Sequence, residues 1–151
     1  MSDKEEACSK PARERTCGGS PDSVKRHVLV IDDDPIQLHI IKKYLEGEYT
    51  VTVIPTGKAA IEYLISNHPD VILLDYVMPL YNGPTVLKII RSRDESRDIP
   101  IFFLTGATDK DIVIECLSYN PAGYIVKPVT KDEIIQKLGD FFMQQERVAG
   151  E

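Results

Sequence analysis

The stretch Val71-Ile72-Leu73-Leu74-Asp75 places four consecutive apolar residues directly before a carboxylate. A short apolar run of branched side chains, bounded by turn residues, predicts a strand that is buried on both faces. Such a strand is typical of a parallel sheet covered by helices. Ligands of these sheets bind just beyond the carboxyl ends of the strands, so Asp75 stands where chemistry is expected. Pro79 and the segment 82–84 then turn the chain before the next helix.

Two kinds of apolar pattern alternate along the chain on either side of this strand. Short runs, several of them rich in β-branched residues, predict further strands at 27–31, 49–54, 99–104 and 124–126. Helical spacing predicts a helix at 35–46, with Asp34 as its N-cap and Pro35 in its first turn. It also predicts helices at 57–66, 85–90 and 109–117 and a last helix after the cap at Thr130. The apolar positions with helical spacing in the first two helices are Ile36, Ile40, Ile41 and Tyr44, then Ala60, Ile61, Leu64 and Ile65.

This alternation predicts an α/β fold, a doubly wound five-stranded parallel sheet with helices on both faces. A (β/α)₈ barrel needs about 250 residues, and it is excluded because the chain has 151. Residues 1–26 mix both charge signs with Gly, Ser and Pro, which predicts a disordered N-terminal tail. We expect the folded domain over 27–143, followed at 144–151 by a polar tail or the start of a linker.

Composition narrows the class of protein further. The net charge of −6 argues against a nucleic-acid surface, which needs clustered Lys and Arg. No apolar run approaches the roughly 20 residues that span a bilayer, and the N-terminus lacks the apolar core of a signal peptide. The cysteines, Cys8, Cys17 and Cys116, form no C-x-x-C pair and fit inert thiols in a reducing compartment. We therefore expect a cytoplasmic protein that binds neither nucleic acid nor membrane.

Polar residues stand at the carboxyl ends of four of the five predicted strands: Asp32-Asp33, Asp75, Thr105 and Lys127. At an effective dielectric constant of about 20, two like charges about 4 Å apart cost on the order of 4 kcal/mol. Lys127 offsets part of this repulsion, and a divalent cation offsets more. Oxygen ligands without a nearby His or Cys favour Mg²⁺. Such a site suits phosphoryl transfer to a carboxylate, with Asp75 as the nucleophile.

Five separate motifs together resemble the receiver domain of two-component response regulators. They are Ile31-Asp32-Asp33-Asp34-Pro35, Leu73-Leu74-Asp75-Tyr76-Val77-Met78-Pro79, Asn82-Gly83, Leu104-Thr105-Gly106 and Gly123-Tyr124-Ile125-Val126-Lys127-Pro128. The match covers roughly residues 27 to 143 in the right order and spacing. The resemblance implies the flavodoxin-like strand order 2-1-3-4-5, which brings the first and third strands together at the switch point.

The resemblance also implies roles for the acidic residues. Asp75 would be the phospho-acceptor, phosphorylated by a sensor histidine kinase, a histidine phosphotransfer protein or a small-molecule donor. Mg²⁺ would be held by Asp33, Asp75 and the backbone carbonyl of Val77, while Asp32 would act largely through water. Val77 and Ala107 fall where side chains influence water attack on the acyl phosphate, so shielding by these apolar residues would set the phosphoryl lifetime.

The remaining motif positions would carry the switch. Lys127 would pair with the phosphoryl oxygens, and its bond to Pro128 would be cis. Thr105 would hydrogen-bond the phosphoryl group, and Tyr124 would pack inward as the aromatic switch that alters a partner-binding surface. Gly106 would leave room for the donor.

Three functions are kept for comparison. The favoured one is a phosphorylation-operated signalling domain, which is not an enzyme because it catalyses only its own phosphorylation and dephosphorylation. The alternatives are a constitutive interaction module of the same fold and, ranked lower, a Mg²⁺-dependent phosphatase, because the D-x-D pattern of haloacid-dehalogenase-type phosphatases is absent after Asp75. The sequence leaves open the cognate kinase, the downstream protein or output domain, homodimer formation, and whether the receiver stands alone.

Overall fold

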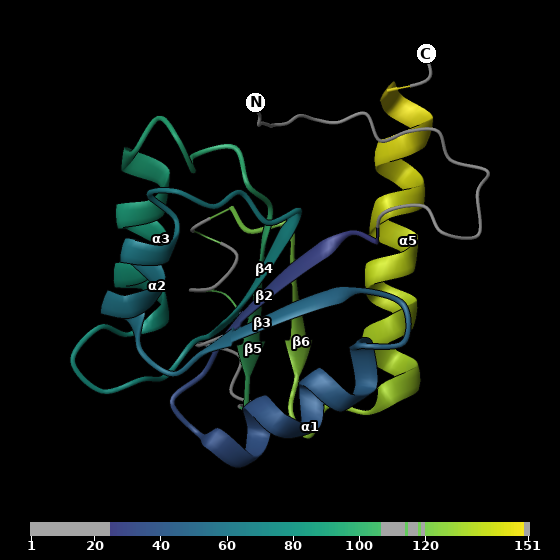
Figure 1. Ribbon diagram of the computed structural model, residues 1–151, viewed down its shortest axis with the longest axis horizontal. Coiled ribbons are helices and arrows are strands. Elements are labelled where there is room, and N and C mark those ends of the chain that lie inside the picture. Colours follow the sequence, from purple (N-terminus) through teal and green to yellow (C-terminus); the bar gives the residue numbers. More distant parts are fainter. Residues whose placement is uncertain (1–24, 107–113, 115–117, 119, 150–151) are drawn as a thin grey trace, which may run out of the picture.

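The computed structural model describes residues 25–106, 114, 118 and 120–149. Its centre is one parallel sheet of five strands (Figure 1). The strands are β2 (His27–Ile31), β3 (Thr50–Ile54), β4 (Val71–Asp75), β5 (Ile101–Thr105) and β6 (Gly123–Val126). Their spatial order is β3-β2-β4-β5-β6, which is 2-1-3-4-5 in chain order. The predicted fold class and strand order are therefore confirmed.

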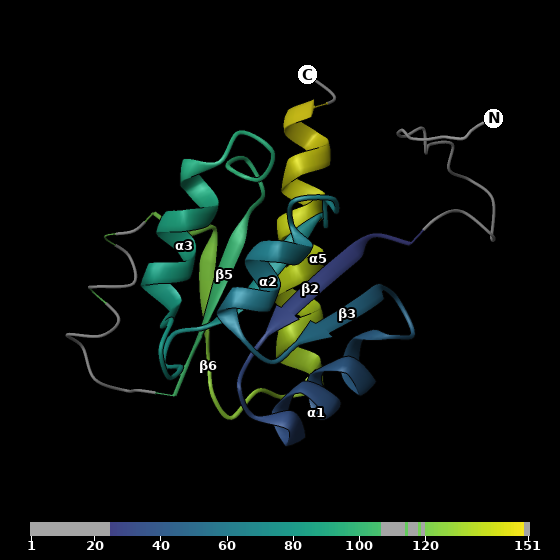
Figure 2. The ribbon, with the colours of Figure 1, turned by 60° about the vertical axis from the view of Figure 1, so that its left-hand side comes forward.

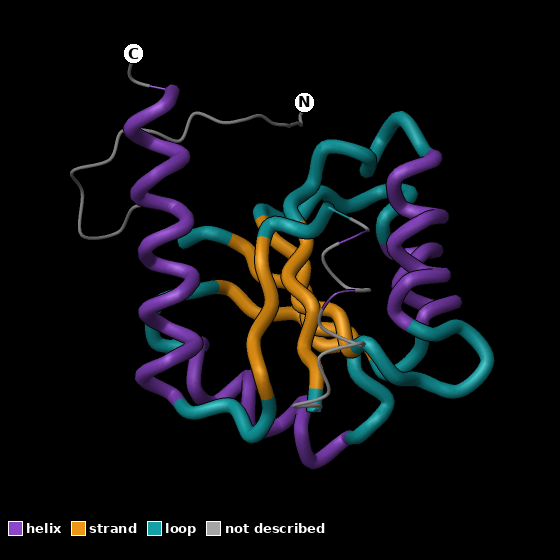
Figure 3. Tube along the Cα trace, turned by 180° about the vertical axis from the view of Figure 1, so that it is seen from behind, coloured by secondary structure: helices purple, strands orange, loops and turns teal. Residues whose placement is uncertain are grey.

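Helices cover both faces of this sheet. One face carries α1 (Pro35–Leu45) and α5 (Lys131–Ala149), and the other carries α2 (Gly57–Tyr63) and α3 (Gly83–Ser92). Figure 1 shows α2 and α3 on one side of the sheet and α5 on the other, and the view from behind shows the strands between them (Figure 3). In the turned view, α2 overlaps α5 (Figure 2). The helix predicted at 109–117 falls largely on residues outside the described part of the chain.

The strand β4 lies at the centre of the core. All five of its residues are buried, as its apolar run predicted. Ile72 and Leu74 pack on the face of α2 and α3, while Val71 and Leu73 pack on the face of α1 and α5. Each such side chain contributes about 1.5–3 kcal/mol through burial. The position of Asp75 is therefore fixed by a rigid support.

Two helices that begin near the carboxyl edge of the sheet have N-caps. The Asp34 carboxylate accepts a hydrogen bond from the Ile36 N–H at 3.0 Å, and α1 begins at Pro35, as predicted. The Thr130 hydroxyl accepts a hydrogen bond from the Glu133 N–H at 3.2 Å ahead of α5. These caps hold the helices that follow Asp32-Asp33 and Lys127.

Several details differ from the sequence predictions. Ile36 is 69% exposed, because the buried stripe of α1 consists of Leu38, Ile41 and Leu45 instead. Ile65 is 54% exposed, because α2 ends at Tyr63 and the chain leaves the helical path before it.

Three helix ends also shift. The helix α1 ends at Leu45, before Gly47, and α3 begins at Gly83 rather than at 85. The segment 144–149, expected as a tail or linker, continues α5. The domain bounds themselves stay a prediction. In the part of the chain that the structure describes, no helix combines the length and apolar character needed to cross a membrane.

Candidate functional site

The site lies at the carboxyl edge of the sheet, where four neighbouring strands end. Asp32 follows β2, and Asp75 is the last residue of β4. Thr105 ends β5, and Lys127 follows β6. The register places Ile31 opposite Leu74, Asp75 opposite Leu104 and Thr105 opposite Val126. Because these strands are parallel and adjacent, their ends bring the four polar side chains to the same edge.

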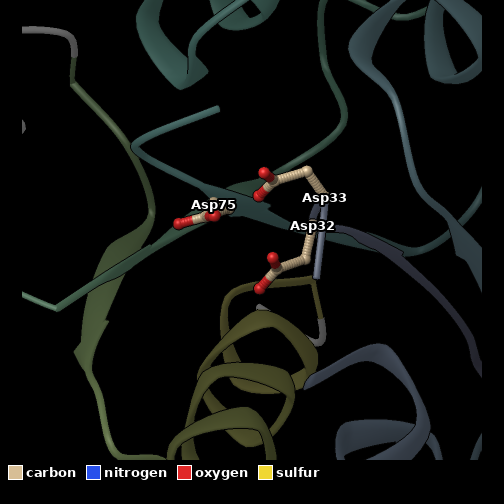
Figure 4. A group of neighbouring side chains, drawn as sticks. All are labelled: Asp32, Asp33 and Asp75. Atoms are coloured by element: carbon tan, nitrogen blue, oxygen red, sulfur yellow. The ribbon is translucent and has the colours of Figure 1, made fainter. Parts of the chain in front are cut away.

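Three carboxylates converge at this edge. One carboxylate oxygen from each of Asp32, Asp33 and Asp75 lies within 4.8 Å of the other two. Figure 4 shows the three side chains grouped together, Asp75 at the end of β4 and Asp32 and Asp33 directly after β2. Asp32 is fully buried and Asp75 is 5% exposed, whereas Asp33 is exposed. Asp33 is therefore the exposed member of the group.

Lys127 is the cation of the site. Its Nζ lies 3.2 Å from Asp32 Oδ2 and 3.2 Å from Asp75 Oδ1, so one ammonium is shared by two buried carboxylates. The backbone N–H of Lys127 donates to the Thr105 carbonyl at 2.7 Å. The Lys127–Pro128 peptide bond is cis, as predicted. With Asp33 added, the group carries three carboxylates and one ammonium, a formal charge of −2.

The pKa shifts reflect this excess of negative charge. Burial, followed by the charge of Asp32, raises the pKa of Asp75 to about 7, although Lys127 opposes the shift. Burial alone would lower the pKa of Lys127, but the charges of Asp75 and Asp32 raise it above its ordinary value. The site therefore keeps its ammonium charged while it penalises the charged form of Asp75.

This donor set fits a hard divalent cation. Three carboxylate oxygens within 4.8 Å of one another match the oxygen ligation that Mg²⁺ takes from proteins. Two of these carboxylates are buried, so they lack the hydration that would otherwise screen their repulsion. A bound cation would offset the charge that raises the pKa of Asp75.

The sequence also predicts site roles for Thr105, Val77, Tyr124 and Ala107. Thr105 is buried at the end of β5, the strand next to β4. The Val77 N–H donates to Asp75 Oδ1 at 3.4 Å, while the Val77 side chain is 67% exposed. Tyr124 is half-buried on β6, and Lys137 Nζ lies 5.9 Å from its ring centroid. Ala107 lies outside the described residues.

Two supporting features were missed by sequence reasoning. The Asp34 N–H donates to Asp32 Oδ1 at 3.0 Å and so fixes the buried carboxylate, although Asp34 was predicted only as a helix cap. A Cβ added at Gly83 would lie 2.7 Å from the Asp75 carbonyl oxygen and 2.8 Å from Tyr76 Cα. Gly83 therefore allows the start of α3 to approach the end of β4. The sequence signals for this were the turn composition of 82–84 and the Asn82-Gly83 motif.

Comparisons with known proteins agree with this geometry. A family model described as the response regulator receiver domain matches residues 28–139. The response regulator SaeR of Staphylococcus aureus (strain USA300) is 31% identical over 122 residues, which cover 80% of this chain and 52% of SaeR. The sensor histidine kinase TmoS of Ectopseudomonas mendocina is 29% identical over 124 residues, which cover 82% of this chain and 12% of TmoS. The chain thus spans about half the length of the first relative and a small part of the second.

Solved structures show the same fold. The receiver domain of the Francisella response regulator 1452 is 31% identical with a TM-score of 0.72, covering 80% of this chain and 99% of that domain. The chemotaxis protein CheY4 of Vibrio cholerae is 24% identical with a TM-score of 0.73, and the match covers 78% of this chain and 99% of CheY4. The receiver domain of sensor histidine kinase PA1611 from Pseudomonas aeruginosa is 25% identical with a TM-score of 0.72, covering 78% and 98%. That structure has a magnesium ion coordinated in its active site cleft.

Proposed function

This chain belongs to the response regulator receiver family. We propose that it is a switch operated by phosphorylation of Asp75. Members of this family are signalling domains rather than classical enzymes. The observation that supports the proposal most directly is the arrangement of Asp75, which shares the Lys127 ammonium with Asp32 at 3.2 Å. Asp33 is the exposed member of the same group.

We assign a Mg²⁺ site to the carboxylates of Asp33 and Asp75 and to the backbone carbonyl of Val77, with Asp32 acting largely through water. The convergence of the three carboxylates supports this assignment. When bound, Mg²⁺ supplies positive charge that neutralises the phosphoryl oxygens and the attacking carboxylate.

The side chains of the protein have separate tasks in the transfer. Lys127 Nζ and the Val77 N–H both engage Asp75 Oδ1, which orients the carboxylate and leaves Oδ2 for attack. A bond forms between this oxygen and phosphorus, while the bond from phosphorus to the donor histidine nitrogen breaks and returns its electron pair to that nitrogen. Lys127 stabilises the negative charge of the transferred group because it remains an ammonium.

The switch is assigned to Thr105 and Tyr124. They lie on adjacent strands, where Phe103 pairs with Tyr124 and Thr105 pairs with Val126. The Thr105 hydroxyl would turn to hydrogen-bond a phosphoryl oxygen, and the Tyr124 ring would pack further inward. A coupling of about 1–3 kcal/mol between these states is sufficient to change partner affinity.

The partners follow from the same assignment. The phosphoryl donor is a sensor histidine kinase or a histidine phosphotransfer protein. The recipient of the signal is a downstream protein or an output domain. A second copy of this chain, in a homodimer, is a further candidate partner. We place this exchange in the cytoplasm, as the sequence led us to expect.

The test is phosphoryl uptake from acetyl phosphate, followed by intact-protein mass spectrometry with and without Mg²⁺. We expect one phosphoryl group per chain only with Mg²⁺, and none in Asp75→Asn. The matched control is Asp34→Asn, because Asn caps a helix as well as Asp does and keeps the backbone N–H that Asp34 donates to Asp32, while the Asp34 side chain has no assigned site role. Uptake that survives Asp75→Asn would overturn the proposal.

The same proteins separate the alternatives. A phosphatase would release phosphate continuously from p-nitrophenyl phosphate in the presence of Mg²⁺. A constitutive interaction module would bind a partner equally well before and after phosphorylation and in Asp75→Asn. The switch predicts neither result.

A further inference from the structure

A cavity of about 590 Å³ lies beside the acidic group, between the loop that precedes α2 and the loop that precedes α3. Its apolar walls include Pro55 from the first loop and Met78, Pro79 and Tyr81 from the second. Its volume falls within the roughly 300–1,000 Å³ of small-molecule sites. Of its lining residues, only Asp33 has a role among those assigned above.

The backbone holds the second loop in an unusual shape. The Tyr81 N–H donates to the Pro79 carbonyl at 2.7 Å across Leu80, whose φ is 67°. This is a γ-turn of the rare form with positive φ, and it leaves the Leu80 side chain fully exposed at the rim.

Gly57 brings the two loops close together. A Cβ at Gly57 would lie 2.6 Å from Val86 Cγ2 and 2.9 Å from Tyr81 Cβ, so glycine is required for this approach. The cavity is therefore formed by local backbone geometry, and a ligand would find it in place.

Two charged residues contribute to the lining. The Lys58 side chain is exposed and makes no ion pair with any residue that the structure describes. Asp33 lines the cavity and also belongs to the three carboxylates of the site. If Mg²⁺ is held as proposed above, the charge of Asp33 is offset and Lys58 remains the uncompensated charge of the lining.

We propose that this cavity binds a small aromatic acid. The ring packs against Met78, Pro79 and Tyr81, and the acidic group pairs with the Lys58 ammonium. The apolar walls account for an aromatic body, and Lys58 accounts for the negative charge. The choice of an anion rests on the proposed function, because without Mg²⁺ the nearby carboxylates repel an acidic ligand.

The experiment uses anilinonaphthalene sulfonate as the aromatic acid and phenylnaphthylamine as its neutral counterpart. Binding to the full chain is followed by fluorescence, and its location by amide chemical shifts in ¹H–¹⁵N spectra, with Mg²⁺ present. We expect saturable binding of the sulfonate, with shifts concentrated at Gly57, Lys58 and Tyr81. Phenylnaphthylamine should bind more weakly.

Lys58→Gln should weaken sulfonate binding by about fivefold, as expected for the loss of one exposed ion pair. The matched control is Lys42→Gln, because Lys42 is exposed on α1, on the opposite face of the sheet, and should leave binding unchanged. Omitting Mg²⁺ should also weaken binding of the sulfonate.

Other outcomes overturn the proposal. Shifts spread over α1 or α5, or no saturable binding, would mean that the cavity is not a ligand site. Equal affinity for the neutral compound, or equal effects of Lys58→Gln and Lys42→Gln, would show that the cavity does not select an acidic group. It would then be an apolar pocket without preference for charge, such as one that accepts a partner's side chain. Phosphoryl uptake is scored separately on the wild type: sulfonate binding without phosphoryl uptake would count against the proposed switch alone, and uptake without sulfonate binding would count against the cavity proposal alone.

Discussion

Lys127 Nζ lies 3.2 Å from Asp75 Oδ1 although the two residues are 52 positions apart in the chain. The same ammonium lies 3.2 Å from Asp32 Oδ2. Two buried carboxylates thus share one cation, and the third carboxylate, Asp33, adds to the excess of negative charge. The electrostatic consequences of this arrangement can be measured without any partner protein.

Asp75→Asn should stabilise the metal-free protein near neutral pH. The pKa of Asp75 is raised in the folded state from 3.8 to about 7. The folded state therefore binds the proton more tightly than the unfolded state does, and this group lowers stability as pH rises from about 4 to about 7. We expect a gain in the free energy of unfolding of up to a few kcal/mol at about pH 8, and little gain at about pH 4.

Urea unfolding of the wild type, Asp75→Asn and the control Asp34→Asn at both pH values measures this difference. Mg²⁺ should restore much of the lost stability to the wild type at about pH 8, because a ligand of the folded state stabilises it by mass action. A wild-type protein that is more stable than Asp75→Asn at high pH without Mg²⁺ would contradict the prediction.

The affinity for Mg²⁺ should depend on pH through the same carboxyl group. Below the pKa of about 7, the cation must displace a proton from Asp75. We expect the association constant to rise about tenfold per pH unit up to about pH 7 and then to level off. Titration calorimetry in buffers of different ionisation enthalpy measures both the affinity and the released proton. Affinity that is constant from pH 5 to 8 would show that Asp75 is not a ligand.

Lys127→Met should move the titration of Asp75 to higher pH. The ammonium opposes the rise in the pKa of Asp75, so its removal leaves burial and Asp32 without this opposition. The shift is measured from the ¹³C chemical shift of the Asp75 carboxyl carbon, and Lys127→Arg serves as the charge-retaining control. Phosphoryl uptake should fall by about 10² or more, since a preorganised charge at the reacting oxygens is lost.

The extent to which the sequence predicts this site has a physical explanation. Asp75 and Lys127 could be brought together from sequence because parallel neighbouring strands end at one edge, whatever the details of their loops. Apolar periodicity was less informative at helix ends. Ile36 and Ile65 are exposed because the buried stripe of α1 and the last residue of α2 are set by tertiary packing. The cavity was not predictable, since it depends on the positive φ of Leu80.

Gly83 and Gly139 should respond in opposite directions to replacement by alanine. A Cβ at Gly83 would lie 2.7 Å from the Asp75 carbonyl oxygen and 2.8 Å from Tyr76 Cα, which are backbone atoms that cannot rotate away. We expect Gly83→Ala to lower the free energy of unfolding by about 1–3 kcal/mol, as overpacking does. Because relief of this contact would displace the end of β4 and with it Asp75, the affinity for Mg²⁺ should fall as well.

Gly139 provides the matched control within α5. A Cβ there meets nothing within 4 Å, and alanine is preferred to glycine inside a helix by about 1 kcal/mol. Gly139→Ala should therefore raise the midpoint of urea unfolding and leave Mg²⁺ affinity unchanged. If Gly83→Ala were as stable as Gly139→Ala and bound Mg²⁺ normally, the close approach of α3 to the end of β4 would not be what positions Asp75.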